Sequence, residues 1–485
     1  MIAIGAPTLQ FEPILPELFL FGVAITGLLY EALAPKAERL WHLALAMAGL
    51  VAAALATFPL WHWTKSRTVM AGMVSVDRFS VVSRLLLIAI AALGLLLGTH
   101  YFARSAEGFR GEFYPLVLFA TGGMTLITVA ADLIVVFLAL EILSLSLYVL
   151  TGITGRPASS EAAMKYFLLG AFSSAFFLFG IAWAYGATGS TKITAVANAL
   201  AGQTGDQAIA LLAFAFLAIG FGFKVSAVPF HQWTPDVYQG APTPVTAFMS
   251  AATKVAAFMA LIRVLDVAFH SLIWDWTPVI WVLAAASVVV GSILAIAQSD
   301  IKRMLAYSSI AHAGFILTGL TSPDQTGIRS AVFYLVSYAL MTVGAFGVVM
   351  LVSSRGEEQT SLTSYAGLSK RSPLLAGLMT LFLLSLAGIP PTAGFVAKVG
   401  VFGAAIRAGH WSLAVIGVVS SVAAAFFYLR VIVLMYMQEP QGGYEEDASI
   451  LPRVVIAIPA ILTLVLGIFP GLIVGILERA SILRW

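Results

Sequence analysis

The sequence contains no cysteine among its 485 residues. That absence excludes disulfides, thiolate-bound iron–sulfur clusters, c-type haem attachment and cysteine-ligated zinc within this chain. The sequence also lacks the glycine-rich phosphate-binding patterns G-x-x-x-x-G-K-[ST] and G-x-G-x-x-G, which argues against nucleotide binding. We therefore expect no cofactor and no metal in this chain.

Charged residues are also scarce. Only 10% of the residues are Asp, Glu, Lys or Arg, whereas 60% are hydrophobic, and the mean hydropathy is +0.97. Soluble domains are roughly 45–50% apolar and about 25% charged. The composition therefore predicts an all-α polytopic membrane protein surrounded by the lipid bilayer. Its net charge of +3 fits basic residues kept in the loops of a membrane protein and gives no argument for nucleic-acid binding.

Apolar runs bounded by proline, glycine and charge clusters predict about 14 transmembrane helices, because one span needs roughly 20 apolar residues. The first run carries Glu17 and lacks a basic n-region and a small-residue cleavage site, so we expect it to be retained rather than removed as a signal peptide. The predicted spans are 14–34, 40–60, 79–102, 113–130, 132–152, 161–186, 207–229, 242–269, 277–298, 303–320, 327–353, 373–407, 411–437 and 451–477.

Prolines interrupt two of these runs, in 221–245 and in 386–398. Each interrupted run places a lysine, Lys224 or Lys398, inside an otherwise apolar stretch. Discontinuous helices of this kind often build ion sites near the middle of a membrane, because the break exposes backbone groups that can bind charge. A functional site is therefore expected at both breaks.

The interrupted runs are the seventh and twelfth predicted spans, which suggests that spans four to eight and nine to thirteen are two copies of a five-helix unit. An odd number of helices per copy makes the two copies inverted across the bilayer. The order of residues agrees, since Lys224 precedes Pro229 whereas Lys398 follows Pro391. We predict four parts: an N-terminal three-helix segment (1–112), a first repeat (113–270), a second repeat (271–438) and a C-terminal helix (439–485).

Four ionisable residues are predicted to lie deep in the membrane: Glu141, Lys224, Lys254 and Lys398. Each would cost roughly 2.5–3.5 kcal/mol if it faced lipid, so all four are expected to face the protein interior, water or one another. A buried lysine near a movable carboxylate can alternate between holding and releasing a proton, which favours a proton relay. The alternative is a set of static buried pairs that fix helix packing.

Three further residues are secondary candidates. Lys165 lies near the start of its predicted span and could simply extend to the membrane interface. His231 and His312 suit proton transfer at neutral pH, although each could instead be a hydrogen-bonded histidine that stabilises a helix break. Nothing in the spacing of these two histidines supports haem ligation.

Other charged residues fall near the ends of spans. Glu31, Asp132 and Asp236 are expected to be solvated or to cap helices. The sequence gives no assignment for three arginines inside or near the ends of spans. These are Arg84, Arg263 and Arg430.

Several segments carry a family resemblance over nearly the whole chain: 15–19 (LPELF), 140–144 (LEILS), 224–244 (KVSAVPFHQWTPDVYQGAPTP), 299–309 (SDIKRMLAYSS) and 388–395 (GIPPTAGF). With these segments the chain resembles the antiporter-like proton-pumping subunits of respiratory complex I. Among them it is most similar to the N-type subunit of the bacterial NADH:quinone oxidoreductase. The start of the chain and a lysine at position 398 favour the N type.

The resemblance implies a fold of fourteen helices with two inverted five-helix repeats and discontinuous helices seven and twelve. It implies that Glu141 pairs with Lys224, that Lys254 is the central relay lysine and that Lys398 lies on the exit side. Lys165, His231 and His312 would be secondary members of a hydrophilic axis. NADH, FMN, iron–sulfur clusters and quinone would be bound by partner subunits, which include other antiporter-like membrane subunits, in a bacterial plasma membrane.

The sequence therefore predicts a membrane subunit without a redox centre that translocates protons while partner subunits transfer electrons. One alternative is a subunit of a multisubunit cation/proton antiporter. A second alternative is a structural scaffold whose buried charges only hold helices together.

Overall fold

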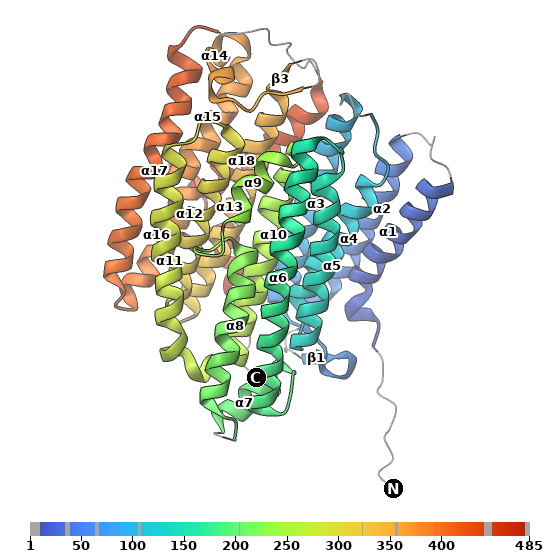
Figure 1. Cartoon of the computed structure of the whole chain (residues 1–485), viewed down its shortest axis with the longest axis vertical. Coiled ribbons are helices and arrows are strands. Elements are labelled where there is room, and N and C mark those ends of the chain that lie inside the picture. The colour runs from blue at the N-terminus through green and yellow to red at the C-terminus, as the bar shows by residue number, and fades with distance from the viewer. Residues whose placement is uncertain are drawn as a thin grey trace.

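The computed structural model describes residues 10–33, 39–63, 67–104, 108–202, 204–322, 324–354, 357–440 and 449–480. These residues form a bundle of helices with two small β-hairpins near its ends (Figure 1). The first helices are α1 (Leu15–Leu33), α2 (Arg39–Thr57), α3 (Arg78–Arg104), α4 (Phe113–Val129), α5 (Leu133–Gly152), α6 (Pro157–Thr188), α7 (Ile193–Ala201), α8 (Gln207–Val225), α9 (Trp233–Gly240) and α10 (Thr243–Arg263).

The remaining helices are α11 (Ile273–Ile296), α12 (Ile301–Leu320), α13 (Gln325–Leu351), α14 (Leu368–Arg371), α15 (Pro373–Ala387), α16 (Ala393–Arg407), α17 (Trp411–Met437), α18 (Ile450–Ile468) and α19 (Gly471–Arg479). A π-helical turn (Val264–Ala268) continues α10. Strands β1 (Arg67–Val69) and β2 (Val74–Val76) pair antiparallel, as do β3 (Ser353–Ser354) and β4 (Glu357–Glu358).

The predicted all-α polytopic fold is confirmed. Eleven helices in the described part of the chain are long and apolar enough to cross a membrane. The predicted spans 113–130, 303–320 and 373–407 correspond to α4, to α12 and to α15 together with α16. The total of fourteen spans stays a prediction. The last predicted span, 451–477, is divided into two helices, because α18 ends at Ile468 and α19 begins after Pro470. Proline has no backbone N–H to donate, so α18 cannot continue through Pro470.

Both predicted helix breaks are present. The seventh predicted span (207–229) contains α8, which ends where Ser226 adopts a left-handed conformation with φ of 63°, and α9 begins after it, within the interrupted run 221–245. The twelfth consists of α15 and α16, and α15 ends at Gly388, where φ is 85°. Pro229 and Pro391 follow these residues and supply no amide hydrogen with which a helix could continue. Each break leaves carbonyl groups at the end of a helix without intrahelical partners.

Helix packing repeats between the two halves of the chain. α4 packs against α5 and α10, and α11 likewise packs against α12 and α17. α6 contacts both α8 and α9, and α13 likewise contacts both α15 and α16. Two five-helix units would pack in this way, if the first consists of α4, α5, α6, the interrupted pair α8 and α9, and α10, and the second of α11, α12, α13, the interrupted pair α15 and α16, and α17. The units meet where α10 packs against α13.

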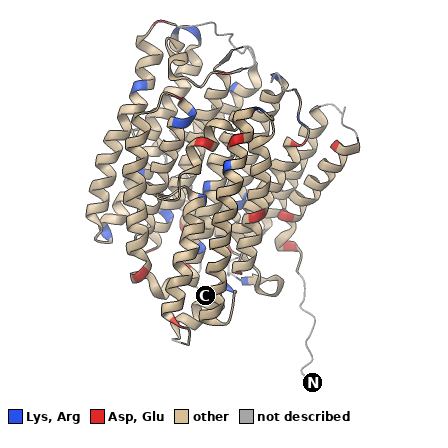
Figure 2. Cartoon of the chain, in the orientation of Figure 1, with Lys and Arg blue, Asp and Glu red and all other residues tan. Residues whose placement is uncertain are grey.

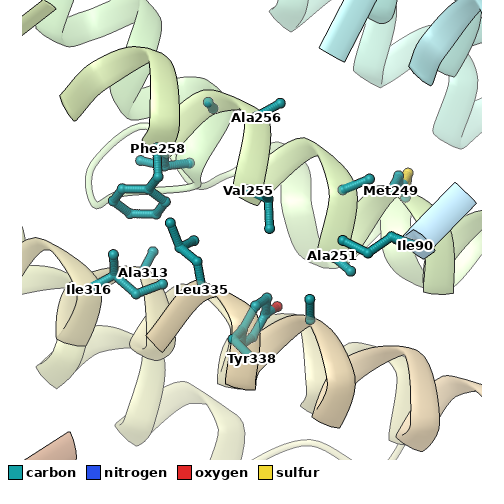
Figure 3. Close-up of a cluster of buried hydrophobic side chains, with 14 of the residues drawn as sticks. Ile90, Met249, Ala251, Val255, Ala256, Phe258, Ala313, Ile316, Leu335 and Tyr338 are labelled. Carbon is teal, nitrogen blue, oxygen red and sulfur yellow. The ribbon is translucent and has the colours of Figure 1, made fainter. Parts of the chain in front are cut away.

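The centre of the bundle is formed around α10, every residue of which is buried. Its apolar side chains, such as Val255 and Phe258, face α13 residues such as Leu335 and Tyr338 (Figure 3). Because protein surrounds α10 on all sides, Lys254 on this helix lies in the protein interior and away from lipid. Figure 2 shows charged residues spread along the length of the bundle, with several of them near its middle.

The structure gives partners to the three arginines that the sequence left unassigned. Arg84 forms a buried ion pair with Glu17 at 2.8 Å, which ties α3 to α1. Arg263 forms a buried ion pair with Asp77 at 2.7 Å. Arg430 donates to the backbone carbonyls of Ile296 and Gln298 at the end of α11, at 2.9 and 2.6 Å. All three arginines therefore join helices that are distant in sequence.

The acidic residues at span ends have specific partners. Asp132 caps α5 by accepting a hydrogen bond from the backbone N–H of Ile134 at 2.9 Å, as predicted. Glu31 instead binds the ring of buried His42 at 2.7 Å. Asp236 lies in the first turn of α9 and forms ion pairs with two basic side chains that are described below.

Candidate functional site

The three predicted relay lysines are all buried. The exposed fraction is 3% for Lys224, 1% for Lys254 and 5% for Lys398, and Glu141 is partly buried. They come from α8, α10 and α16, and Glu141 comes from α5. A buried ammonium group needs hydrogen-bond acceptors, because leaving it unpaired costs far more than leaving a neutral polar group unpaired. The identity of the hydrogen-bond acceptors around each lysine therefore shows whether the ammonium group is held by a charged or by a neutral partner.

Lys224 lies at the end of α8, next to the break. Its ammonium donates to the hydroxyl of Ser144 on α5 at 2.7 Å. The same ammonium lies 5.6 Å from the ring centre of Tyr148 and 5.4 Å from that of Tyr166, within the range of cation–π attraction. The lysine is therefore held by a hydroxyl and by aromatic rings.

Glu141 lies one helical turn before Ser144 on α5 and accepts a hydrogen bond from the hydroxyl of Ser174 on α6. The ion pairs found within 4 Å among the described residues do not include one between Glu141 and Lys224. The direct pair that the resemblance implied is thus replaced by an arrangement in which Ser144 contacts the lysine.

Lys254 binds α12. Its ammonium donates to the backbone carbonyl and to the hydroxyl of Ser309, the latter at 2.6 Å. The hydroxyl of Tyr338 on α13 also donates to the Ser309 hydroxyl, at 2.7 Å. The ammonium lies 5.2 Å from the ring centre of Tyr338. Lys254, Ser309 and Tyr338 thus form one buried polar cluster between α10, α12 and α13.

His312 lies one turn after Ser309 on α12 and is 1% exposed. Its Nδ1 is 2.7 Å from the hydroxyl of Tyr334, and its Nε2 is 3.3 Å from the hydroxyl of Tyr428. The Tyr428 hydroxyl also bonds that of Ser308. The structure therefore places this predicted histidine near Lys254, inside the polar interior of the second repeat.

Lys398 lies on α16, just after the second break. Its ammonium donates to the backbone carbonyl of Ala387, the last residue of α15, at 2.8 Å. This carbonyl is free because the helix ends there, and a cation at a helix C-terminus is favourable for the helix dipole. The ammonium also lies 4.8 Å from the ring centre of Phe315 on α12. The break thus supplies the lysine with its acceptor.

Lys165 and His231 lie apart from these clusters. The side chain of Lys165 is 43% exposed and forms ion pairs with Glu161 and Asp236, both at 2.8 Å. Asp236 also binds Arg303 at 2.6 Å, so this group is a charged surface patch between α6, α9 and α12. His231 is half-buried in the turn between α8 and α9. Among the described residues, no hydrogen bond joins Lys165 or His231 to the buried lysines.

Comparison with known proteins identifies the family. The family model described as "NADH:quinone oxidoreductase/Mrp antiporter, TM" matches residues 130–424. The subunit N of the NADH-quinone oxidoreductase of Rhodococcus opacus is 45% identical, and the match covers 99% of this chain and 97% of that one. The chain belongs to the subunit N family. Like other subunit N chains, it is an antiporter-like membrane protein.

Solved structures agree with this membership. A chain of respiratory complex I from Thermus thermophilus with bound aureothin is 36% identical to this subunit N family member, with a TM-score of 0.82. The match covers 96% of this chain and 100% of that chain. A chain of the Mrp complex from Dietzia sp. has a TM-score of 0.86 at 22% identity over 97% of both chains, which shows a common fold.

The sequence of this subunit N family member did not point to the serines and tyrosines that form the polar groups around Glu141, His312 and the buried lysines. These residues are Ser144, Ser174, Ser308, Ser309, Tyr334, Tyr338 and Tyr428. One signal was available, because Ser144 follows Glu141 by three residues and Ser309 precedes His312 by three, which places each pair on one helix face. A hydroxyl can donate and accept at once, so such groups can pass protons between lysines.

Proposed function

We propose that this chain translocates protons across a bacterial plasma membrane as subunit N of a proton-translocating NADH:quinone oxidoreductase. Glu141, Lys224, Lys254 and Lys398 would carry the protons. Electron transfer in partner subunits would supply the energy, with NADH, FMN, iron–sulfur clusters and quinone bound there. The chain itself would contribute no redox centre.

One observation carries this proposal: Lys224, Lys254 and Lys398 are each bound by hydroxyl or carbonyl oxygen, whereas buried Lys302 forms an ion pair with Glu358 at 2.9 Å. A lysine in a close salt bridge is fixed in its charged form. A lysine bound by neutral groups can gain or lose a proton when a nearby charge changes. The three lysines proposed for the relay therefore have the surroundings that proton transfer needs.

Glu141 is the group through which coupling would arrive. It is only partly buried, and neighbouring Leu138 and Leu145 on α5 are 53% and 54% exposed on the outside of the bundle. A charge in an adjacent membrane subunit could therefore act on Glu141. Movement of Glu141 relative to Lys224 would then change the proton affinity of the lysine. Partner subunits, including other antiporter-like subunits, would cover part of this outer surface and lipid the rest.

The proposed path uses both halves of the fold. Glu141 and Lys224 belong to the first repeat (113–270), and Lys398 belongs to the second (271–438). Lys254 stands on α10 at the junction of the two repeats and binds Ser309 of the second. The three-helix segment up to residue 112 and the part from residue 439 onward would support this core.

The experiment replaces Lys254 in the whole enzyme. We expect Lys254→Met to permit assembly but to lower the number of protons translocated per NADH oxidised in proteoliposomes. The control is Lys370→Met, because Lys370 is 55% exposed and pairs with exposed Glu439. An unchanged proton ratio in the Lys254→Met enzyme would contradict the relay and favour a scaffold.

A separate measurement distinguishes the antiporter alternative. We expect the complex that copurifies with this chain to contain flavin and iron–sulfur clusters and to oxidise NADH. A complex without these centres that exchanges sodium for protons would instead identify a cation/proton antiporter subunit.

A further inference from the structure

The imidazole of His312 has a tyrosine hydroxyl on each of its two nitrogens. Tyr334 of α13 lies at Nδ1, at 2.7 Å, and Tyr428 of α17 lies at Nε2, at 3.3 Å. The exposed fraction is 0% for Tyr334 and 1% for Tyr428. Three helices, α12, α13 and α17, thus hold a buried row of three groups that can each donate and accept a proton.

This row has the chemistry of a proton shuttle. A neutral imidazole carries one N–H and one bare nitrogen, so one tyrosine accepts from the ring while the other donates to it. When a proton is transferred from one hydroxyl to the bare nitrogen, an N–H bond forms and that O–H bond breaks, and the hydroxyl takes a new proton from its other partner, which for Tyr428 is Ser308. The opposite nitrogen then gives its proton to the second hydroxyl, which gives up its own proton in the same step, so that the ring is neutral again. Neither phenol needs to remain ionised.

The row lies between two of the proposed relay lysines. On one side, Lys254 binds Ser309, which lies one helical turn before His312 and accepts a hydrogen bond from Tyr338. Tyr338 lies one turn after Tyr334 on α13, and its ring lies 5.4 Å from that of His312. Figure 3 shows Tyr338 at the contact between α10 and α13.

On the other side, Phe315 lies one turn after His312 on α12. Its ring lies 6.3 Å from that of Tyr334 and 4.8 Å from the ammonium of Lys398. The order along α12 is therefore Ser309 beside Lys254, then His312, then Phe315 beside Lys398. The Tyr334–His312–Tyr428 row is therefore positioned on α12 between the residue beside Lys254 and the residue beside Lys398.

We propose that Tyr334 and Tyr428 are proton-transfer residues, and that their hydroxyls form the two ends of a path through His312 between Lys254 and Lys398. The proposal rests on the proton translocation proposed above and extends it to two residues on α13 and α17. It gives the aromatic side chains of the second repeat a role besides packing.

The test removes one oxygen atom at a time. Tyr334→Phe and Tyr428→Phe keep the ring and delete the hydroxyl. The matched control is Tyr114→Phe on α4, because Tyr114 is also buried, at 2% exposed, and donates to Thr99 at 3.0 Å outside the row. Each variant is made in the whole enzyme, and protons translocated per NADH oxidised are measured in proteoliposomes.

We expect the Tyr334→Phe and Tyr428→Phe enzymes to assemble and to lose as much proton translocation per NADH as Lys254→Met. Tyr114→Phe should keep the wild-type ratio, which shows that loss of any buried phenol hydroxyl is not sufficient. If a Phe variant does not assemble, 3-fluorotyrosine at the same position keeps the hydroxyl and makes it more acidic. A changed rate of proton translocation then supports the path, and an unchanged rate overturns it.

The outcomes separate this inference from the proposed function. A wild-type ratio in Lys254→Met would overturn proton translocation by this chain, and the tyrosine path with it. A reduced ratio in Lys254→Met together with wild-type ratios in both Tyr variants would overturn only the tyrosine path.

Discussion

The ammonium of Lys224 donates a hydrogen bond to the hydroxyl of Ser144 across 2.7 Å. This contact joins the end of the interrupted helix α8 to the middle of α5, between residues that are 80 positions apart. Ser144 is one turn from Glu141, so a small movement of either side chain would bring the lysine from the hydroxyl toward the carboxylate. The hydroxyl thus holds the lysine near the acid without forming a salt bridge.

We predict that Ser144→Ala reduces proton translocation by less than Lys224→Met does. Loss of the hydroxyl removes one acceptor of a buried ammonium, and an unsatisfied buried polar group costs roughly 1–3 kcal/mol. The lysine itself remains, so the path is impaired rather than lost. The measurement is protons per NADH in proteoliposomes.

Ser146→Ala is the control for that substitution, because among the described residues the Ser146 hydroxyl bonds only the backbone of its own helix, at 2.9 Å from the Ile142 oxygen. Equal effects of the two serine substitutions would contradict a specific role of Ser144.

We predict that Lys165→Met changes the proton ratio little. Lys165 is 43% exposed, and its partners are Glu161 and Asp236 at the surface. Exposed ion pairs contribute on the order of 0–1 kcal/mol, and this pair is separate from the buried hydroxyl groups. The variant is measured beside Lys254→Met in the same membranes. A loss as large as that of Lys254→Met would place Lys165 in the path.

The sequence was sufficient to find the lysines and both helix breaks, because charge and proline are rare in apolar runs. Lys224 and Lys398 could thus be located without a structure. The sequence could not show that Ser144 rather than Glu141 contacts Lys224, since hydroxyls are common in membrane helices and their partners depend on how distant helices pack. For the same reason the roles proposed for Tyr334 and Tyr428 could be inferred only from the contacts between α12, α13 and α17.

Asp77 gives a prediction about acid stability. It is buried just before α3 and accepts hydrogen bonds from Arg263 at 2.7 and 3.1 Å. Burial alone would raise the pKa of Asp77, but the charge and hydrogen bonds of Arg263 and the hydrogen bonds of Ser80 lower it from 3.8 to about 2. Because the folded pKa is the lower one, the stabilisation is present above pH 3.8 and is lost as the pH falls toward 2.

We therefore predict that Asp77→Asn lowers the Tm of the complex at neutral pH. The Tm of the variant should also fall less than the wild-type Tm when the pH is lowered. A pKa shift of this size corresponds to about 2 kcal/mol of folding free energy. Removal of one partner from a buried ion pair costs roughly 3–5 kcal/mol of stability. Asp206→Asn is the control, because Asp206 is an exposed cap of α8. Thermal unfolding in detergent at several pH values is the measurement, and identical curves for the two variants would argue against the prediction.

The second helix break depends on close packing at Gly394. A Cβ at this position would lie 1.9 Å from the backbone oxygen of Ser385 on α15, whereas one at Gly400 on the same helix would lie 3.4 Å from Ser330. Overpacking a core typically costs about 1–3 kcal/mol, and here backbone must move. Because Lys398 is one turn from Gly394 and binds the end of α15, Gly394→Ala should displace the lysine from its acceptor.

We predict that Gly394→Ala lowers both the Tm of the complex and the protons translocated per NADH, while Gly400→Ala preserves both. The two variants add the same methyl group to α16, so a difference between them reports the contact with α15 and not helix propensity. A Gly394→Ala enzyme with wild-type stability and proton ratio would mean that the spacing of α15 and α16 does not position Lys398.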